Sequence, residues 1–456
     1  MKSSLRPASS GNLTTEASGI EQFVLSVLFV LLVVAYGSIG RDVFFNRLND
    51  PNIDDPIGAV LVYIRFGLCA LTVMIVVMTT GLAAIRNALP LALLPYLVLA
   101  MVSFVWADDT KGVLRAAIIL TALYFAMSPL ILRLGREKAM MLLVHVIAVV
   151  VILSTLLAVF LPSIGTHTGE EMVQASHGGR WRGLFSHKNG LGPWGAFGTI
   201  IFLFYPGMMR VPRLYTFVAL VCAAACLIFS GSATSLIGAV TMLIALALLR
   251  INRAGGPLVT LVAFVGGLFA GVILLTLFYD QFFGLIGRDS SFTGRTEIWE
   301  IAIEYIKLSP ILGHGYQSLG GPTFLEFVAS YAQQAIQGPE SLYLASLLDL
   351  GIVGFTLFFL PIVMALVRVA ANLRAVRSNG ERDTLEAAFL IVTSALFMGI
   401  TETTPFVCTG FDGVVCFVAL FVILQFDPRS NVGRVRSTAA APVARRSPTT
   451  LNVRTV

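Results

Sequence analysis

Apolar residues recur in long uninterrupted runs along almost the whole chain, separated by short polar breaks. A run of about 20 apolar residues is long enough to cross a bilayer as a helix. Because the runs are continuous rather than alternating with period two, they predict an all-α polytopic membrane protein and not a membrane barrel. The runs predict twelve spans, near residues 22–39, 57–79, 88–106, 113–132, 140–162, 190–206, 213–231, 235–249, 257–278, 342–367, 386–401 and 413–426.

Composition agrees with this pattern. Hydrophobic residues make up 57% of the 456 positions and charged residues only 12%, too few for the surface of a soluble domain. The first apolar run lacks a small-residue cleavage site, so we interpret it as a span rather than a signal peptide. The five cysteines form no CxxC motif and are expected to pack as small apolar side chains, although a bridge between Cys408 and Cys416 stays open.

Charge placement predicts the orientation of the chain. If the N-terminus is cytoplasmic, 20 of the 31 Lys and Arg residues lie in cytoplasmic segments, so the positive-inside rule puts both termini in the cytoplasm. We therefore divide the chain into a cytoplasmic tail (1–21), a membrane domain (22–427) and a disordered Ser/Thr/Pro/Arg-rich cytoplasmic tail (428–456). The net charge of +6 is not gathered on one soluble face, which argues against a nucleic-acid partner.

Two external segments are unusually long, about 163–189 and 279–341. The first ends in GRWRGLFSHKNGLG (179–192), so its positive charge lies on the side where topology requires none. The second holds apolar positions at helical spacing from Ile298 to Leu308, followed by Ser309-Pro310. This spacing predicts a short amphipathic helix of about a dozen residues that lies on the membrane surface.

Basic residues in these two segments favour an anionic ligand. Arginine presents a planar fork of donors that matches phosphate oxygens two at a time. A diphosphate would be held by basic residues from both segments, namely Arg180, Arg182, Lys188, Arg288 and Arg295. Two simpler interpretations stay open: these side chains contact lipid headgroups, or they pair with nearby carboxylates. For His187, a structural role is a simpler interpretation than a catalytic one.

Three motifs in these segments resemble the O-antigen ligase / Wzy-type polymerase superfamily, most closely its exopolysaccharide-production (ExoQ-type) branch. WRGLFSHKNGLG (181–192) resembles its G-x-F-x-[HN]-[PK]-N signature. Residues 287–318 resemble its T-G-R-[TD]-x-[IL]-W…P-[IL]-[LI]-G-x-G block, and ESLYLASLLDLGIVG (340–354) resembles its H-N-x-Y-L-x-x-L-L-x-L-G-x-x-G block. The likeness covers most of the chain, because the order of spans and the large late loop also match.

The resemblance implies a GT-C-like membrane glycosyltransferase in the bacterial inner membrane, with its active face in the periplasm. Such enzymes move a sugar chain from an undecaprenyl-diphosphate carrier to an acceptor hydroxyl, with neither a metal nor another cofactor. Its implied partners are the lipid-linked oligosaccharide, membrane lipids and other polysaccharide export proteins. By motif position, Arg182 or Arg180 together with Arg295 would hold the donor diphosphate, with His187 and Asn189 in support.

The third motif departs from the family at one position of chemical interest. Counting back from Gly351, the family's histidine falls on Glu340 and its asparagine on Ser341. Because a glutamate also accepts protons, the substitution keeps general-base chemistry open at Glu340, with Arg295 as the second catalytic residue. It equally fits a different acceptor or a weakened enzyme.

Three further residues and one rival function complete the analysis. Arg65 lies inside an apolar run, where structural pairing is the simpler interpretation and contact with the donor's phosphate the alternative. Asp349 is expected to cap or pair, and Glu402 to lie in a solvated loop unless it faces the same external cavity. The rival function is a transporter (flippase) of lipid-linked oligosaccharides, which twelve spans with a basic external patch also fit.

Overall fold

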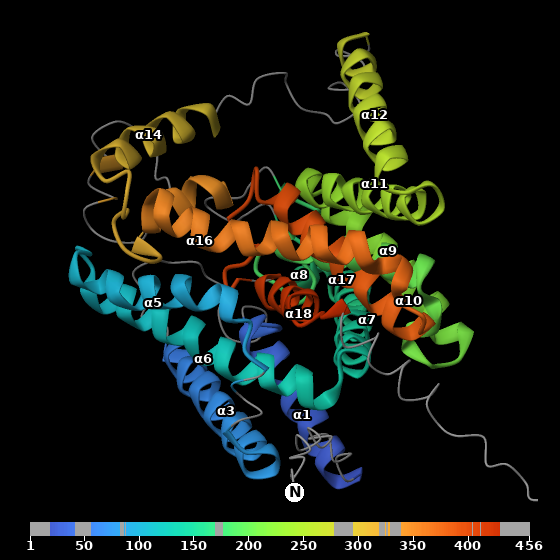
Figure 1. Ribbon diagram of the computed structural model, residues 1–456, viewed down its shortest axis with the longest axis horizontal. Helices are drawn as coiled ribbons and strands as arrows, with labels where there is room; N and C mark the ends of the chain where they lie inside the picture. Colours follow the sequence, from blue (N-terminus) through green and yellow to red (C-terminus); the bar gives the residue numbers. More distant parts are fainter. Residues whose placement is uncertain are drawn as a thin grey trace, which may run out of the picture.

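The computed structural model describes residues 19–41, 56–82, 86, 88–168, 177–277, 295–318, 324, 327–328, 339–403, 405–410 and 412–428. The side chains of residues 56, 57, 59, 268–277 and 295–297 fall outside this description. Within the described residues the regular structure is helical, apart from an isolated β-bridge between Thr166 and Trp181 (Figure 1). The all-α class is therefore confirmed.

The described helices follow one another along the chain. Their bounds are α1 (Gly19–Tyr36), α3 (Pro56–Thr80), η1 (Leu91–Leu93), α5 (Leu94–Val102), η2 (Ser103–Val105), α6 (Thr110–Leu134), α7 (Arg136–Phe160), α8 (Pro162–Gly165), α9 (Lys188–Phe204), η4 (Pro206–Met209), α10 (Arg213–Ser230), α11 (Ala233–Gly255), α12 (Pro257–Leu277), α14 (Arg295–Leu308), α16 (Leu342–Asn372), η6 (Leu373–Ala375), α17 (Asn379–Met398) and α18 (Gly413–Leu424).

Each of the twelve predicted spans contains one of these helices, but the count of twelve crossings is not confirmed. Among the described residues, seven helices are long and apolar enough to cross a membrane: α1, α3, α6, α7, α10, α11 and α16. The apolar helices α5 and α18 are shorter, and the 12 residues of α18 extend only about 18 Å at 1.5 Å per residue. The structure is therefore a polytopic membrane protein with at least these seven candidate crossings.

The core lies around α18, which is apolar on every side. All residues from Gly413 to Ile423 are buried, as expected for a helix without a polar face. It packs against α17, α16, α7 and α6, and it occupies the middle of the bundle (Figure 1). By contrast, α3 packs on α6 and α1 at the edge of the bundle and leaves much of its apolar surface exposed, as a lipid-facing helix would.

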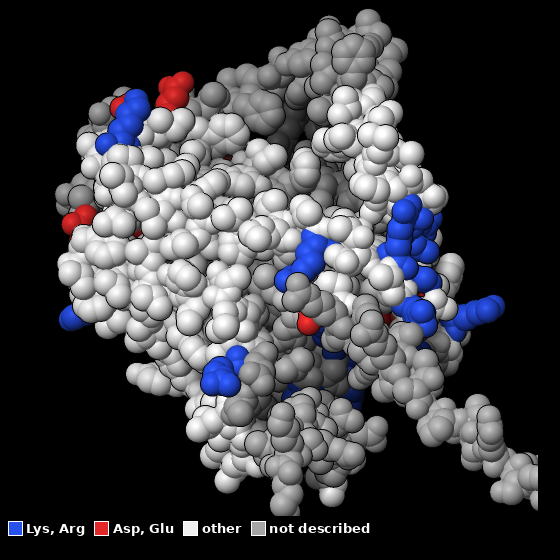
Figure 2. Space-filling view, in the orientation of Figure 1, with Lys and Arg blue, Asp and Glu red and all other residues white. Residues whose placement is uncertain are grey.

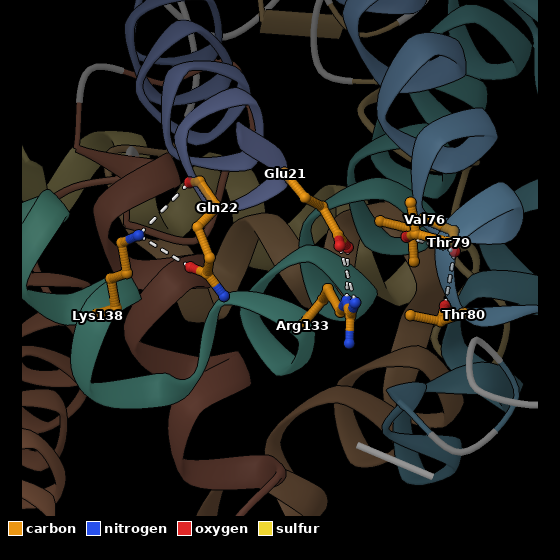
Figure 3. A network of polar contacts seen from close by, with 7 residues as sticks. All are labelled: Glu21, Gln22, Val76, Thr79, Thr80, Arg133 and Lys138. Atoms are coloured by element: carbon orange, nitrogen blue, oxygen red, sulfur yellow. Dashed lines mark hydrogen bonds and ion pairs between the residues drawn. The ribbon is translucent and has the colours of Figure 1, made fainter. Parts of the chain in front are cut away.

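One end of the bundle is held by ion pairs and hydrogen bonds. Arg133 on α6 pairs with Glu21 on α1, and Lys138 on α7 donates to Gln22 (Figure 3). At the same end Arg253 of α11 pairs with a buried Glu386 of α17 at 2.7 Å. We call this the ion-pair end. These basic side chains belong to the segments that the positive-inside rule assigns to the cytoplasm.

The opposite end, which we call the loop end, comprises residues 37–41, 161–168, 177–187, 309–318, 339–341, 399–403, 405–410 and 412. In the view of Figure 2, most of the surface between the charged groups carries neither Lys, Arg, Asp nor Glu, consistent with a lipid-facing belt. The densest group of Lys and Arg lies toward the right of that view.

The predicted surface helix is α14, which ends at Leu308 immediately before Ser309-Pro310, as expected. It packs against α16, and its position on a membrane surface stays a prediction. Ile301, Ala302 and Tyr305 are buried in a small apolar cluster together with Leu348. Since Glu304 and Lys307 are exposed while these apolar side chains are buried, α14 is amphipathic as predicted. All five cysteines are free thiols, so the Cys408–Cys416 bridge is absent.

Candidate functional site

The arginine-rich loop of the first motif is folded onto α8 and the C-terminal part of α7. The backbone N–H groups of Arg182 and Gly183 both donate to the carbonyl of Gly165, at 2.9 and 3.0 Å. The N–H of Leu184 donates to the hydroxyl of Ser154. Gly183 has a φ of +57°, and a Cβ there would overlap the Ser154 side chain. The motif therefore needs glycine at this position to keep the loop against α7.

The two arginines of this loop lie on different turns. Arg180 is exposed, and its guanidinium lies so close to Gly231, in the turn between α10 and α11, that a Cβ there would overlap it. Arg182 is half-buried and its Nε donates to the carbonyl of Ile164 at 3.0 Å. Between them, the Trp181 ring packs on the ring of Phe229 with centroids 4.8 Å apart. Both guanidinium groups are thus positioned at the loop end.

The end of the first motif forms the N-terminus of α9. His187 is the N-cap residue, and its Nδ1 accepts the N–H of Asn189 at 3.1 Å, so this nitrogen carries no proton in this arrangement. Lys188 is buried, with 8% of its side chain exposed, and its backbone N–H donates to Nε2 of His167. His187 therefore has a structural role as the cap of α9, and its supporting role in the site stays a prediction. The rings of His167, His177 and His187 also pack edge to face on one another.

Glu402 joins the first motif to the third. Its carboxylate accepts a hydrogen bond from the side-chain amide of Asn189 at 2.9 Å and a longer one from the hydroxyl of Thr234. Its backbone carbonyl accepts the N–H of Leu342, the first residue of α16, at 3.0 Å. The interpretation of Glu402 as a solvated loop residue is therefore wrong, because residues 399–402 fold back against α9 and α16.

Glu340 lies close to the contact between Glu402 and Leu342, because it precedes Leu342 by two residues in the sequence. It is exposed and has a φ of +43°, a left-handed backbone conformation that non-glycine residues seldom adopt. Ser341 follows it as the buried N-cap residue of α16, with its hydroxyl 3.4 Å from the Gly399 carbonyl. The residue at the family's histidine position is thus carried by the loop end, beside the segment that holds Glu402.

The second and third motifs interlock through glycines. The helix α16 is broken at Leu350 and Gly351, which have non-helical dihedral angles. The backbone of Gly313 lies so close that a Cβ there would be 2.5 Å from the carbonyl of Asp349, and a Cβ on Gly351 would overlap Ile311. Peptide groups freed by the break are bonded to residues 310–315, for example the N–H of Gly315 to the carbonyl of Asp349 at 2.8 Å.

Asp349 and Arg65 are both buried. The backbone of Gln317 and Ser318, in the turn after the second motif, acts electrostatically on the Asp349 carboxylate, whose buried Oδ1 has no hydrogen-bond partner among the described residues. Arg65 donates from Nε to the Ala35 carbonyl at 3.0 Å and from Nη2 to the Ser38 hydroxyl at 2.9 Å. The pairing predicted for Arg65 is confirmed, and its partners are neutral.

The second half of the predicted diphosphate site is not tested. Arg288 lies outside the described residues. Arg295 opens α14, but its side chain lies outside the description, so its distance from Arg180, Arg182 or Lys188 stays a prediction. The structure does describe how α14 is connected to the rest of the site. Residues 309–318, which follow α14, interlock with α16, and α16 begins at Leu342 beside Glu402. Among the described residues, no three His, Cys, Asp or Glu side chains are arranged to hold a metal ion.

Comparison with known proteins agrees with the motifs. Residues 218–359, from α10 into α16, match the family model described as O-antigen ligase. A second match is the exopolysaccharide production protein ExoQ of Rhizobium meliloti (strain 1021), which is 26% identical over 194 residues. The chain resembles O-antigen ligase/Wzy-type proteins and is ExoQ-like. The ExoQ match covers 40% of this chain and 45% of the relative, so less than half the length of ExoQ is aligned.

The likeness supports a membrane protein of polysaccharide biosynthesis. The family-model match contains the second and third motifs but begins after the first one, which ends at Gly192. The hydrogen bonds of Glu402 connect the first motif, which lies outside the family-model match, to the matched region. Neither Glu402 nor Thr234 belongs to a motif, so the sequence carried no signal for this connection beyond the polar stretch ITETT in an apolar chain.

Proposed function

We propose that this ExoQ-like protein is a membrane glycosyltransferase that polymerises undecaprenyl-diphosphate-linked oligosaccharide repeat units at the periplasmic face of the bacterial inner membrane. Ligation of the same oligosaccharides to another acceptor is the second form of the reaction. Both use one chemistry: a sugar leaves a lipid diphosphate and joins an acceptor hydroxyl. The name of the ExoQ relative favours polymerisation for exopolysaccharide.

The observation that carries the proposal is the double role of Glu402. Its side chain binds Asn189 of the first motif, and its backbone binds Leu342 of the third. Arg180, Arg182 and Glu340 therefore belong to segments fastened to one another at the loop end. A site assembled from distant segments on a fixed frame is what positioning of two substrates requires. A set of unrelated surface arginines would not need this frame.

In the proposed step, the acceptor hydroxyl oxygen forms a bond to the anomeric carbon of the donor sugar. The bond between this carbon and the diphosphate oxygen breaks, and the diphosphate leaves with the electron pair. Glu340 accepts the hydroxyl proton. Arg180 or Arg182, Lys188, Arg288 and Arg295 stabilise the charge on the leaving diphosphate by bidentate and point-charge contacts, the kind of electrostatic term that is usually the largest in catalysis.

A transporter is not favoured by the comparisons, because the matched family is described as a ligase. The same purified protein tests both functions. Proteoliposomes loaded with lipid-linked repeat units should yield longer sugar chains together with free undecaprenyl diphosphate. If the lipid moves between leaflets without any change in the length of its sugar chain, the protein is a transporter and the transferase proposal is wrong.

Variants test the site. We expect Arg295→Gln and Arg182→Gln to lower the rate of transfer by about 10²–10³-fold, the loss that follows removal of one donor from a charge-stabilising site. Arg213→Gln is the matched control, since Arg213 is an exposed arginine in the first turn of α10 at the ion-pair end. Thermal unfolding of each purified variant separates a lost contact from a lost fold. Wild-type rates in both motif variants would remove the arginines from the reaction.

A further inference from the structure

A basic cavity lies at the loop end, beside the arginine-rich loop. It has a volume of about 410 Å³ and lies among α1, α3 and α6, and Gln317 and Thr409 also line it. A volume of this size is within the range of small-molecule sites. Arg41, Arg65 and Arg115 line it, and the lining contains no Asp or Glu within the part of the chain that the structure describes.

Arg65 is the fixed member of this set. Only 6% of its surface is exposed, and its guanidinium lies 5.5 Å from the centre of the Tyr36 ring. Its bonds to Ala35 and Ser38 use two of the five guanidinium N–H donors. A buried charge whose partners are a carbonyl and a hydroxyl lacks the counter-charge that such groups normally have. An anion in the cavity would supply it.

Arg115 is the accessible member. It lies on the second turn of α6 and is exposed, and within the described residues it has neither a hydrogen bond nor an ion pair. The neighbouring Cys408 contributes no negative charge, because burial raises the pKa of its thiol to about 12. Arg41 and Arg115 both repel the Arg65 guanidinium electrostatically. Two arginines that line one cavity, Arg65 and Arg115, favour an anion with several oxygens over a single carboxylate.

The position of the cavity suggests a lipid-linked anion. The N–H of Gly40, next to Arg41, donates to the carbonyl of Leu184 in the arginine-rich loop at 3.1 Å, so the two basic regions are neighbours. The cavity also borders α3, whose outward side chains Val60, Tyr63 and Ile64 are exposed and apolar. A hydrocarbon chain attached to an anion in the cavity would run along this face, whereas a free phosphate would make no use of it.

We propose that this cavity, which we call the three-arginine cavity, is a second polyprenyl-diphosphate site that holds the lipid carrier of the acceptor. The proposal rests on the proposed function and makes it more specific. A polymerase joins two lipid-linked chains, so its acceptor also bears a diphosphate, whereas a ligase to a different acceptor needs only one such site. The cavity therefore assigns the chain to polymerisation.

The test counts lipids bound to the purified full-length protein by native mass spectrometry with undecaprenyl diphosphate as the probe. Wild type should bind two molecules per chain. Arg115→Gln should bind one, with its affinity for the second lowered about tenfold or more, as expected for the loss of a charge-assisted bidentate contact. Arg182→Gln should also bind one, and the double variant none. Arg213→Gln is the control and should keep both.

The remaining outcomes separate the sources of the anion. If only one lipid binds to wild type, and Arg182→Gln abolishes its binding, the acceptor site is refuted while the transferase proposal stands. If phosphatidylglycerol displaces the Arg115-dependent molecule as well as undecaprenyl diphosphate does, the cavity is an ordinary headgroup site and the acceptor role is wrong. Inorganic diphosphate binding there with the same affinity would refute the lipid-linked part. Two lipids retained in every variant would overturn both proposals.

Discussion

Replacing Gly351 with alanine should separate the second motif from the third. Gly351 has φ and ψ of 60° and −165°, a region that is accessible essentially to glycine alone and costs other residues about 1–3 kcal/mol. An added Cβ would also overlap the backbone of Ile311, so residues 310–315 would have to move away from α16. That movement lengthens the hydrogen bonds from Ile352 to Pro310 and from Val353 to Ile311, each worth about 0.5–1.5 kcal/mol.

Together these terms give a destabilisation of about 2–6 kcal/mol, or a fall in the thermal midpoint on the order of 5 °C. Gly266→Ala on α12 is the matched control, because a Cβ there meets nothing within 4 Å. Fluorescence-detected size exclusion after heating measures the midpoint in detergent, and the transfer assay measures function. A midpoint in Gly351→Ala equal to that of wild type would refute the argument that the kink is held by this glycine.

Three further predictions follow from the site. Glu402→Gln and Asn189→Ala should each slow transfer, and their effects should be non-additive. We expect a coupling of about 1.5–3 kcal/mol in a double-mutant cycle, as for a hydrogen bond to a charged group. Additive effects would contradict the hydrogen bond between the two side chains. Glu340→Gln should lower turnover by about 10²–10⁴-fold at an unchanged thermal midpoint, and unaltered turnover would remove Glu340 from the base role.

The third concerns Cys408, in a variant whose other cysteines are alanine. Because burial raises its pKa to about 12, maleimide labelling at pH 8 should be about a thousandfold slower than for an ordinary thiol and should rise tenfold per pH unit; a plateau by pH 9 would contradict this.

Much of the fold follows from the sequence because membrane helices are specified locally. Each apolar run from α1 to α18 became a helix near its predicted bounds, and Pro310 marked the end of α14. The number of crossings was harder to predict. The run that became α18 is short and buried on all sides by protein, and an apolar run alone does not distinguish a helix in lipid from a helix in a protein core.

The site was only partly predictable, for a related reason. The motifs identified Arg182, Asn189 and Glu340 because each lies in a recognisable local pattern. Glu402 belongs to no pattern, and its role arises only when the segment before α18 folds back onto α9. The three-arginine cavity is even harder to predict from the sequence, because Arg115 and Arg65 meet there only through the packing of α6 on α3. Contacts between distant segments are set by tertiary packing, which spacing along the chain does not encode.

The central claim is that this protein transfers a sugar chain from a lipid diphosphate. The most direct measurement incubates the purified protein with undecaprenyl-diphosphate-linked repeat units alone and follows both products over time. The proposed reaction predicts sugar chains of increasing length and one released undecaprenyl diphosphate for each new glycosidic bond. Bound but unconsumed substrate, with no diphosphate released and no chain lengthened, would contradict the claim.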